Sequence, residues 1–211
     1  MKITVFGVGF VGSALVRELN SRRHEVIAVS RHPGTDVPSG VVAVSGSVHD
    51  RGFLQEVTAG ANVLVSALPA GTGSNALDVS SAVLLSAAEA VGARLGVVGG
   101  SAVLPLVEGG PPQAGTPGFP AWLIPRAQAH QRTLDLLRSA PEHLDWFYLV
   151  PAAEFGPHQP GVRTGLCRTS STAQVTDEDG RSTLGVEDYA IAFADEIDSP
   201  KTHRTWLAVG Y

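Results

Sequence analysis

The sequence has almost no cysteine, and this limits the kinds of site that it can form. Cys167 is the only cysteine among 211 residues, so the chain cannot form an internal disulfide or a cysteine metal site. The histidines show no HxH or HExxH spacing, and we therefore expect no bound metal. This cysteine usage favours a cytoplasmic protein over a secreted, disulfide-linked one.

Strong net charge, long apolar runs and aromatic residues are also scarce. The formal net charge is −5 with both signs interspersed, which argues against nucleic acid or an anionic membrane as the main partner. No apolar stretch approaches the roughly 20 residues of a membrane span. Aromatic residues make up 6% of the chain and apolar residues 44%, so Ala, Val, Leu and Gly must fill the interior. Such a composition is typical of helices packed closely on a parallel sheet.

Short apolar runs alternate with helical patterns along most of the chain. This alternation predicts one domain, residues 1–211, built as a doubly wound parallel α/β sheet. The predicted strands are residues 3–6, 25–30, 41–45, 62–67, 95–98 and 146–150, followed by 162–167, 173–175 and 205–209. The predicted helices are residues 13–21, 51–59, 75–91, 125–140 and 186–197, and Asp179-Gly180 indicates a turn.

A glycine-rich turn separates the first predicted strand from the first predicted helix. It comprises Gly7, Val8, Gly9, Phe10, Val11 and Gly12, with the spacing GxGxxG. In such a turn Gly7 permits a sharp bend, Gly9 lets the backbone approach a pyrophosphate, and Gly12 lets the helix pack close to the strand. The N-terminus of the helix then offers unpaired N–H groups to the phosphates. The motif therefore predicts a dinucleotide-binding site.

The end of the second strand predicts which dinucleotide binds. An acidic residue there binds the ribose 2′-hydroxyl of NAD, whereas a basic residue accommodates the 2′-phosphate of NADP. The sequence reads Ser30-Arg31-His32, with no Asp or Glu. Ser30 can donate a hydrogen bond, and Arg31 offers a planar, permanently charged guanidinium. We predict NADPH rather than NADH, and the alternative is that Arg31 is a solvated surface arginine.

Residues 108–120 are rich in Gly and Pro and can form neither a helix nor a central strand. They follow the fifth predicted strand, at the sheet edge where open α/β proteins bind ligands. Two interpretations stay open, a surface loop and a flap over the substrate. Among the histidines, His130 and His158 are the two that could face this edge.

Several short segments together carry a family resemblance. They are MKITVFG at the start, residues 24–26 (HEV), 66–68 (SAL), 98–101 (VGGS), 133–138 (TLDLLR), 144–146 (LDW), 150–152 (VPA), 163–165 (RTG), 188–192 (DYAIA) and 209–211 (VGY). Over essentially its whole length, the chain thereby resembles the atypical short-chain dehydrogenase/reductases of the NADH-flavin reductase group, which are relatives of biliverdin IX-beta/flavin reductase. The resemblance implies a Rossmann fold with a small C-terminal substrate region.

The resemblance also implies roles for individual residues. The turn at residues 7–12 would bind the pyrophosphate, although this family usually spaces its glycines GxxGxxG, which leaves the loop conformation open. Besides Ser30 and Arg31 at the 2′-phosphate, the implied cofactor contacts are Leu68 and Pro69 at the adenosine, Gly100 at the nicotinamide and Pro151 at its carboxamide. Ser101 is the candidate catalytic residue, because its hydroxyl could bond the acceptor or the carboxamide. The alternative is a hydroxyl that bonds the backbone at the strand end.

The tyrosine and lysine that most short-chain dehydrogenases use for proton exchange are missing. None of Tyr148, Tyr189 and Tyr211 is followed by a lysine four residues later. Trp122 and Arg126 have that spacing, but an indole is no general acid and an arginine cannot be deprotonated. Ala152 and Ala153 follow Pro151, where biliverdin-type relatives have a histidine, which argues against a biliverdin substrate.

A flavin or quinone needs less from the protein than an alcohol or ketone. Hydride passes to an electron-poor ring and water can supply the proton, so the protein chiefly provides stacking geometry and a dry pocket. The leading hypothesis is therefore an NADPH-dependent reductase of a small planar acceptor such as a flavin or quinone. One alternative is a redox sensor that binds NADP(H) without turnover and signals through a partner. Another is an epimerase or reductase that uses groups with no recognisable pattern.

Overall fold

The computed structural model describes residues 1–32, 37–71, 73 and 76–211. Within them one eight-stranded sheet has the order β3-β2-β1-β4-β5-β6-β8-β7. Neighbouring strands are parallel except for the edge pair of β7 and β8. The strands are β1 (Lys2–Phe6), β2 (Glu25–Ser30), β3 (Val42–Ser45), β4 (Val63–Ser66), β5 (Arg94–Val98), β6 (Trp146–Val150), β7 (Arg168–Ser170) and β8 (Thr205–Gly210).

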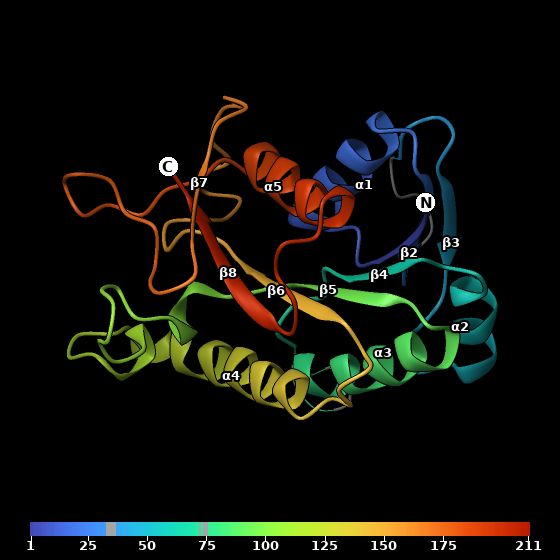
Figure 1. Cartoon of the computed structure of the whole chain (residues 1–211), viewed down its shortest axis with the longest axis horizontal. Helices are drawn as coiled ribbons and strands as arrows, with labels where there is room; N and C mark the ends of the chain where they lie inside the picture. Colours follow the sequence, from blue (N-terminus) through green and yellow to red (C-terminus); the bar gives the residue numbers. More distant parts are fainter. Residues whose placement is uncertain (33–36, 72, 74–75) are drawn as a thin grey trace.

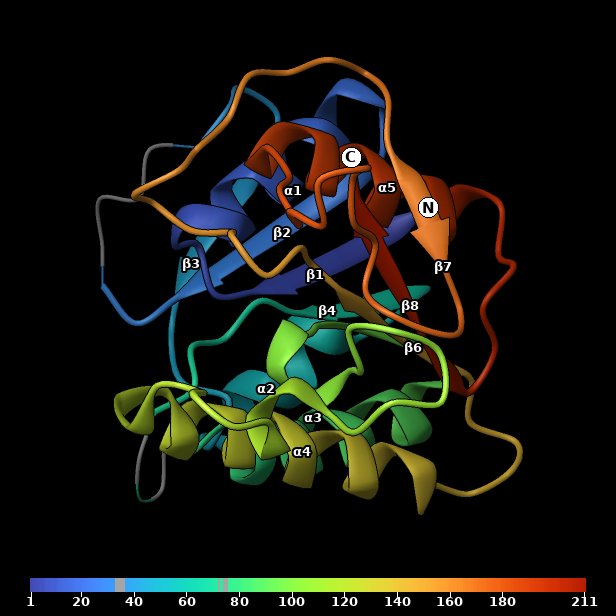
Figure 2. The same ribbon diagram turned by 90° about the vertical axis from the view of Figure 1, so that its left-hand side faces the viewer.

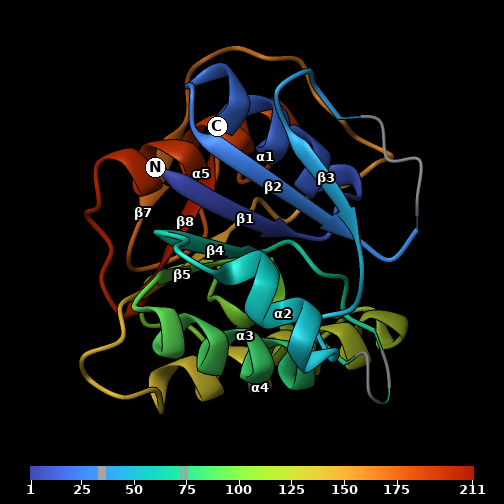
Figure 3. The ribbon, with the colours of Figure 1, turned by 90° about the vertical axis from the view of Figure 1, so that its right-hand side faces the viewer.

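Helices cover both faces of this sheet (Figure 1). One layer contains α1 (Phe10–Ser21) and α5 (Val186–Asp198). The other contains α2 (Arg51–Thr58), α3 (Leu77–Val91) and α4 (Ile124–Arg138). Figures 2 and 3 show the same two layers from opposite sides. The predicted doubly wound parallel sheet, the Rossmann fold, is therefore confirmed.

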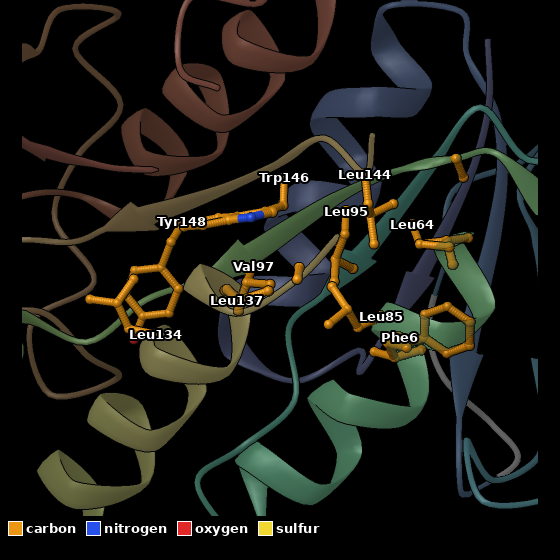
Figure 4. Packing of buried hydrophobic residues seen from close by; sticks show 14 of the residues in the cluster. Phe6, Leu64, Leu85, Leu95, Val97, Leu134, Leu137, Leu144, Trp146 and Tyr148 are labelled. Atoms are coloured by element: carbon orange, nitrogen blue, oxygen red, sulfur yellow. The ribbon is translucent and has the colours of Figure 1, made fainter. Parts of the chain in front are cut away.

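Each helix layer packs on its own apolar core. Leu84, Leu134 and Trp146 belong to the core beneath α2, α3 and α4, whereas Leu15 and Phe193 belong to the core beneath α1 and α5. Figure 4 shows part of the first core, with side chains of β5 and β6 pointing toward α3 and α4. Because helices cover both faces, the central strands are buried throughout; every residue of β4 and β6 is buried. In the described part of the chain, no helix is both long and apolar enough to cross a membrane.

The observed elements differ from the predicted ones mainly after β6. Residues 162–167 and 173–175 are not strands, and β7 (Arg168–Ser170) lies between them. Val162 and Leu166 are 78% and 76% exposed, so the apolar run that predicted a strand does not face a core. The turn at Asp179-Gly180 is confirmed, because Gly180 N–H donates to Asp177 O at 3.0 Å.

Three helix starts also differ from the predicted ones, that of α4 by a single residue, since it begins at Ile124. Helix α1 begins at Phe10, three residues before the predicted start, so the last half of the glycine turn is its first turn. Helix α3 begins at Leu77, and its predicted first residue, Asn75, lies outside the described residues. Between β5 and α4 the chain forms three short 3-10 turns, η2 (Ser101–Val103), η3 (Gln113–Gly115) and η4 (Ala121–Leu123).

Asp188 fastens the loop after β6 to the first turn of α5. Its carboxylate accepts hydrogen bonds from the backbone N–H groups of Thr164 and Gly165 and from the hydroxyls of Thr164 and Tyr211. Burial alone would raise the pKa of Asp188, but the hydrogen bonds from Tyr211 and Thr164 outweigh it and hold the pKa below that of an ordinary aspartate. The ionised form is therefore the one that the fold binds.

We expect the Asp188→Ala variant to lose about 1.5–3 kcal/mol of unfolding free energy at neutral pH, the contribution of a charged hydrogen bond. Because the folded-state pKa is depressed, this contribution is present above the unfolded-state pKa of about 3.9 and is lost as the pH falls through the folded-state value. Urea denaturation of both proteins from neutral to acidic pH tests this. A difference between them that persists undiminished at the acid end would contradict it.

Candidate functional site

A large cleft opens at the carboxyl ends of the strands, where the strand order reverses between β1 and β4. Its volume is about 1530 Å³, and loops after β1, β2, β3, β4, β5 and β6 all line it. Open α/β sheets bind ligands at this reversal. Pockets for one small ligand measure about 300–1000 Å³, so this cleft has room for more than one such molecule.

The glycine turn lines the cleft, and each of its three glycines is needed for a different structural reason. Gly7 has φ +96°, and a Cβ on it would lie 2.5 Å from the carbonyl oxygen of Ala67. A Cβ on Gly12 would lie 1.8 Å from the carbonyl oxygen of Gly7, so no side chain fits. Gly9 has no atom within 4 Å of its Cβ position and lines the open cleft. Gly7 and Gly12 hold the turn tight, and Gly9 leaves room for a ligand.

Helix α1 presents its first turn to that space. Gly9 is its N-cap residue, the Ser13 N–H donates to Gly9 O at 2.9 Å, and no side chain caps the helix. Phe10 and Val11 line the cleft, whereas Gly12 is buried behind them. Uncapped N–H groups and the positive end of the helix dipole favour a bound anion. These residues therefore fit the pyrophosphate of a dinucleotide, and the tight turn is compatible with the GxGxxG spacing.

The charged and imidazole side chains that line the cleft are all basic. They are Arg17, Arg31 and Arg126, together with the imidazoles of His32, His49, His130 and His158, and the described lining contains no Asp or Glu. Arg31 is exposed, directly after β2. The hydroxyl of Ser30 donates to the carbonyl oxygen of His32 at 2.6 Å, so its proton is used within the loop. A cleft of this charge favours a polyanionic ligand.

The other predicted site residues lie along the same cleft. Leu68, Pro69, Gly100, Ser101 and Pro151 all line it. The structure thus brings together every predicted site residue, with Gly12 behind the surface rather than on it. The loops after β4, β5 and β6 carry these five residues to the sheet edge.

Two glutamines that sequence reasoning missed fix the wall near Ser101 and Pro151. Gln113 Nε2 donates to Ser101 O at 3.1 Å and to Gln174 Oε1 at 3.3 Å, and Gln174 Nε2 donates to Pro151 O at 3.1 Å. Both glutamines are buried. Because Gln113 belongs to the Gly/Pro-rich segment, its side chain fastens that segment to the cleft wall.

The Gly/Pro-rich segment and the residues that follow it supply aromatic side chains to the cleft. Phe119 and Trp122 line it, and Trp122 is 78% exposed. Phe155, in the loop after β6, also lines the cleft. Its ring centroid lies 5.8 Å from that of Phe10 in the glycine turn. Figure 2 shows the segment between β5 and α4 lying beside α4. Residues 108–120 therefore contribute to the cleft rather than forming a loop remote from it.

His130 and Tyr148 form a buried pair, in which His130 lines the cleft and Tyr148 lies behind it. The Nδ1 atom of His130 lies 2.8 Å from the hydroxyl of Tyr148, which also accepts the Gly100 N–H at 3.2 Å. Burial, and less strongly the charge of Arg126, lower the pKa of His130 to about 4. Burial also raises the pKa of Tyr148. At neutral pH both groups are therefore uncharged.

The comparisons with known proteins agree with the fold and the turn. The model of a family described as NAD(P)H-binding matches residues 7–180. The uncharacterized protein YwnB of Bacillus subtilis (strain 168) is 30% identical over 205 residues, which cover 95% of this chain and 94% of YwnB. The structure of a Burkholderia pseudomallei protein, provisionally named an exported protein, is 33% identical to this chain. The match covers 100% of both chains, with a TM-score of 0.87. A Streptococcus pneumoniae TIGR4 structure, provisionally named NADH-flavin reductase, is 26% identical with a TM-score of 0.88, over 100% of this chain and 99% of that one.

Proposed function

Since this chain belongs to the NAD(P)H-binding family, we propose that it is an NADPH-dependent reductase of a flavin, quinone or similar planar acceptor. The bound nicotinamide cofactor would supply the hydride. The observation that carries the proposal is the cleft itself, whose lining includes the aromatic side chains Phe119, Trp122 and Phe155 besides the glycine turn. Aromatic side chains of this kind stack on planar rings. The name of the Streptococcus pneumoniae relative points to the same chemistry.

The charge of the cleft supports NADPH over NADH. NADPH carries an additional phosphate, and Arg31 stands after β2 where the ribose 2′ position of a bound dinucleotide is read. The described lining has no carboxylate that would bind a 2′-hydroxyl or repel a 2′-phosphate.

The described lining contains no lysine, which supports an acceptor whose reduction needs no tyrosine–lysine pair. Lys2 and Lys201, the chain's two lysines, do not line the cleft. Tyr148 is fully buried, with its hydroxyl bonded to His130 and Gly100. Hydride transfer to a conjugated ring can proceed with a proton from water, so the residues need only bind and orient the acceptor. We also place the protein in the cytoplasm, because its lone cysteine can form no internal disulfide.

The test is NADPH consumption with a panel of acceptors. We expect the purified protein to accelerate the loss of NADPH absorbance with FMN, riboflavin or a quinone, and to prefer NADPH to NADH. The Trp122→Ala variant tests the acceptor site separately from the cofactor site. It should leave NADPH affinity unchanged and raise the KM for the acceptor by about three- to tenfold, since stacking contributes about 0.5–1.5 kcal/mol. NADPH binding in calorimetry with no oxidation across the panel would contradict a reductase and favour a redox sensor.

A further inference from the structure

The buried His130–Tyr148 pair has a defined direction of hydrogen bonding. The Tyr148 hydroxyl oxygen accepts the Gly100 N–H, and Nδ1 of His130 is the acceptor that the described residues offer to the hydroxyl proton. A buried hydroxyl that donates to nothing costs about 1–3 kcal/mol. Tyr148 therefore donates to Nδ1, and in the neutral ring the proton resides on Nε2.

The Nε2 side of the ring lies at the wall of the cleft. A Cβ added to Gly100 would meet Nε2 at 2.9 Å and Cδ2 at 2.6 Å, so the imidazole occupies the space that a side chain at position 100 would need. His130 lines the cleft, and Nε2 has no hydrogen-bond partner among the described residues. Gly100 and Tyr148 thus hold an imidazole whose N–H group is available to a ligand.

The ring is fixed as well as oriented. Tyr148 projects from β6 toward α4, as Figure 4 shows beside Leu134. Both Tyr148 and His130 are buried, at 0% and 5% exposure, and their rings meet edge to face. Arg126, one helical turn before His130, also lines the cleft, and its charge acts against protonation of the imidazole. The group is therefore a neutral donor, not a cation, at neutral pH.

We propose that the Nε2–H group of His130 donates a hydrogen bond to a carbonyl oxygen or ring nitrogen of the acceptor, and that Tyr148 is the positioning residue that sets this tautomer. The proposal rests on the proposed reductase function. It restricts the acceptor to a planar ring conjugated with such an atom, a description that flavins and quinones share. Hydride addition brings two electrons and one hydrogen to the acceptor and leaves negative charge on the conjugated atom. The His130 N–H stabilises that charge, and a proton from water completes the reduction.

Three variants separate this role from a structural one. His130→Leu removes the donor, and we expect kcat with the acceptor to fall about 10- to 100-fold, the value of a hydrogen bond to a charged group. His130→Gln places an amide N–H near the Nε2 position and should recover part of that loss. His143→Gln, at an exposed histidine outside the cleft, should behave like the unchanged protein. The dissociation constant for NADPH should stay within about twofold in all three.

A second readout needs no turnover. Nuclear magnetic resonance of the ring nitrogens should show the Nε2–H tautomer for His130, assigned by the signal that His130→Gln removes. Tyr148→Phe, which deletes only the hydroxyl, should convert it to a mixture of tautomers. An Nδ1–H tautomer in the unchanged protein would overturn the proposal.

The kinetic outcomes distinguish this proposal from the one on which it rests. If the unchanged protein oxidises NADPH and His130→Leu matches it, His130 has no such role and the reductase stands. If His130→Leu weakens NADPH binding in parallel with turnover, the residue is structural and the proposal also fails. If the unchanged protein binds NADPH but reduces nothing, both proposals fail together.

Discussion

Replacing Gly12 with alanine is expected to abolish nicotinamide dinucleotide binding. The new Cβ would lie 1.8 Å from the carbonyl oxygen of Gly7 and 3.3 Å from Cβ of Ala67. The first of these neighbours is backbone, so relief requires the start of α1 to move away from β1. At least two charge-assisted hydrogen bonds to the pyrophosphate would be lost, and at about 1.5 kcal/mol each this weakens binding by at least about 100-fold. The overpacking should also destabilise the fold by about 1–3 kcal/mol.

Two further glycines provide matched controls for this result. Gly9→Ala meets no atom within 4 Å, so it should fold normally and still bind the dinucleotide less tightly, because its methyl group enters the cleft. Gly115→Ala, also with no neighbour within 4 Å, lies outside the cleft lining and should change neither property. Calorimetric titration with NADPH and urea denaturation measure the two effects separately. Unimpaired NADPH binding by Gly12→Ala would refute the assignment of the turn.

The second large effect is expected at Arg31. An aspartate in its place would repel the 2′-phosphate of NADPH and could accept a hydrogen bond from the 2′-hydroxyl of NADH. A charged hydrogen bond contributes about 1.5–3 kcal/mol, so NADPH affinity should fall about 10- to 100-fold while NADH affinity holds or rises. The preference between the two cofactors should therefore disappear or reverse.

Dissociation constants for both nucleotides, measured at the same ionic strength, test this change. Arg51→Asp makes the same change of charge at an exposed residue outside the cleft lining and serves as the control for long-range electrostatics. A variant Arg31→Asp that still prefers NADPH would show that Arg31 does not bind the 2′-phosphate.

The parts of the fold that were predictable are those encoded locally. The strands of the central sheet are uninterrupted apolar runs because both of their faces are buried, and the glycine turn has a fixed spacing. The strands predicted at residues 162–167 and 173–175 were misplaced, whereas the one predicted at 205–209 coincides with β8. Strand β7 (Arg168–Ser170) consists of polar residues at a sheet edge, while the apolar Val162 and Leu166 are exposed. The spacing of apolar residues therefore does not distinguish a polar edge strand from an exposed apolar loop.

The sequence predicted residues that the folded chain brings together along one cleft, but it did not predict the residues that support them. Gln113 and Gln174 are separated by 61 residues and meet only in the folded chain. Tyr148 stands in the apolar run of β6, so it has the sequence context of a core residue, and nothing local links it to His130. For the wall on α4, the sequence offered one signal: Arg126 and His130 are four residues apart, which places both on one face of the helix.

The separation of the two cores has an evolutionary consequence. The glycine turn leads into the layer of α1 and α5, whereas His130 and Arg126 belong to α4 in the opposite layer, and the sheet lies between the two apolar clusters. Substitutions that reshape the wall on α4 therefore leave the packing beneath the nucleotide turn intact. Selection can therefore change the acceptor that such a protein binds while the nicotinamide cofactor stays the same.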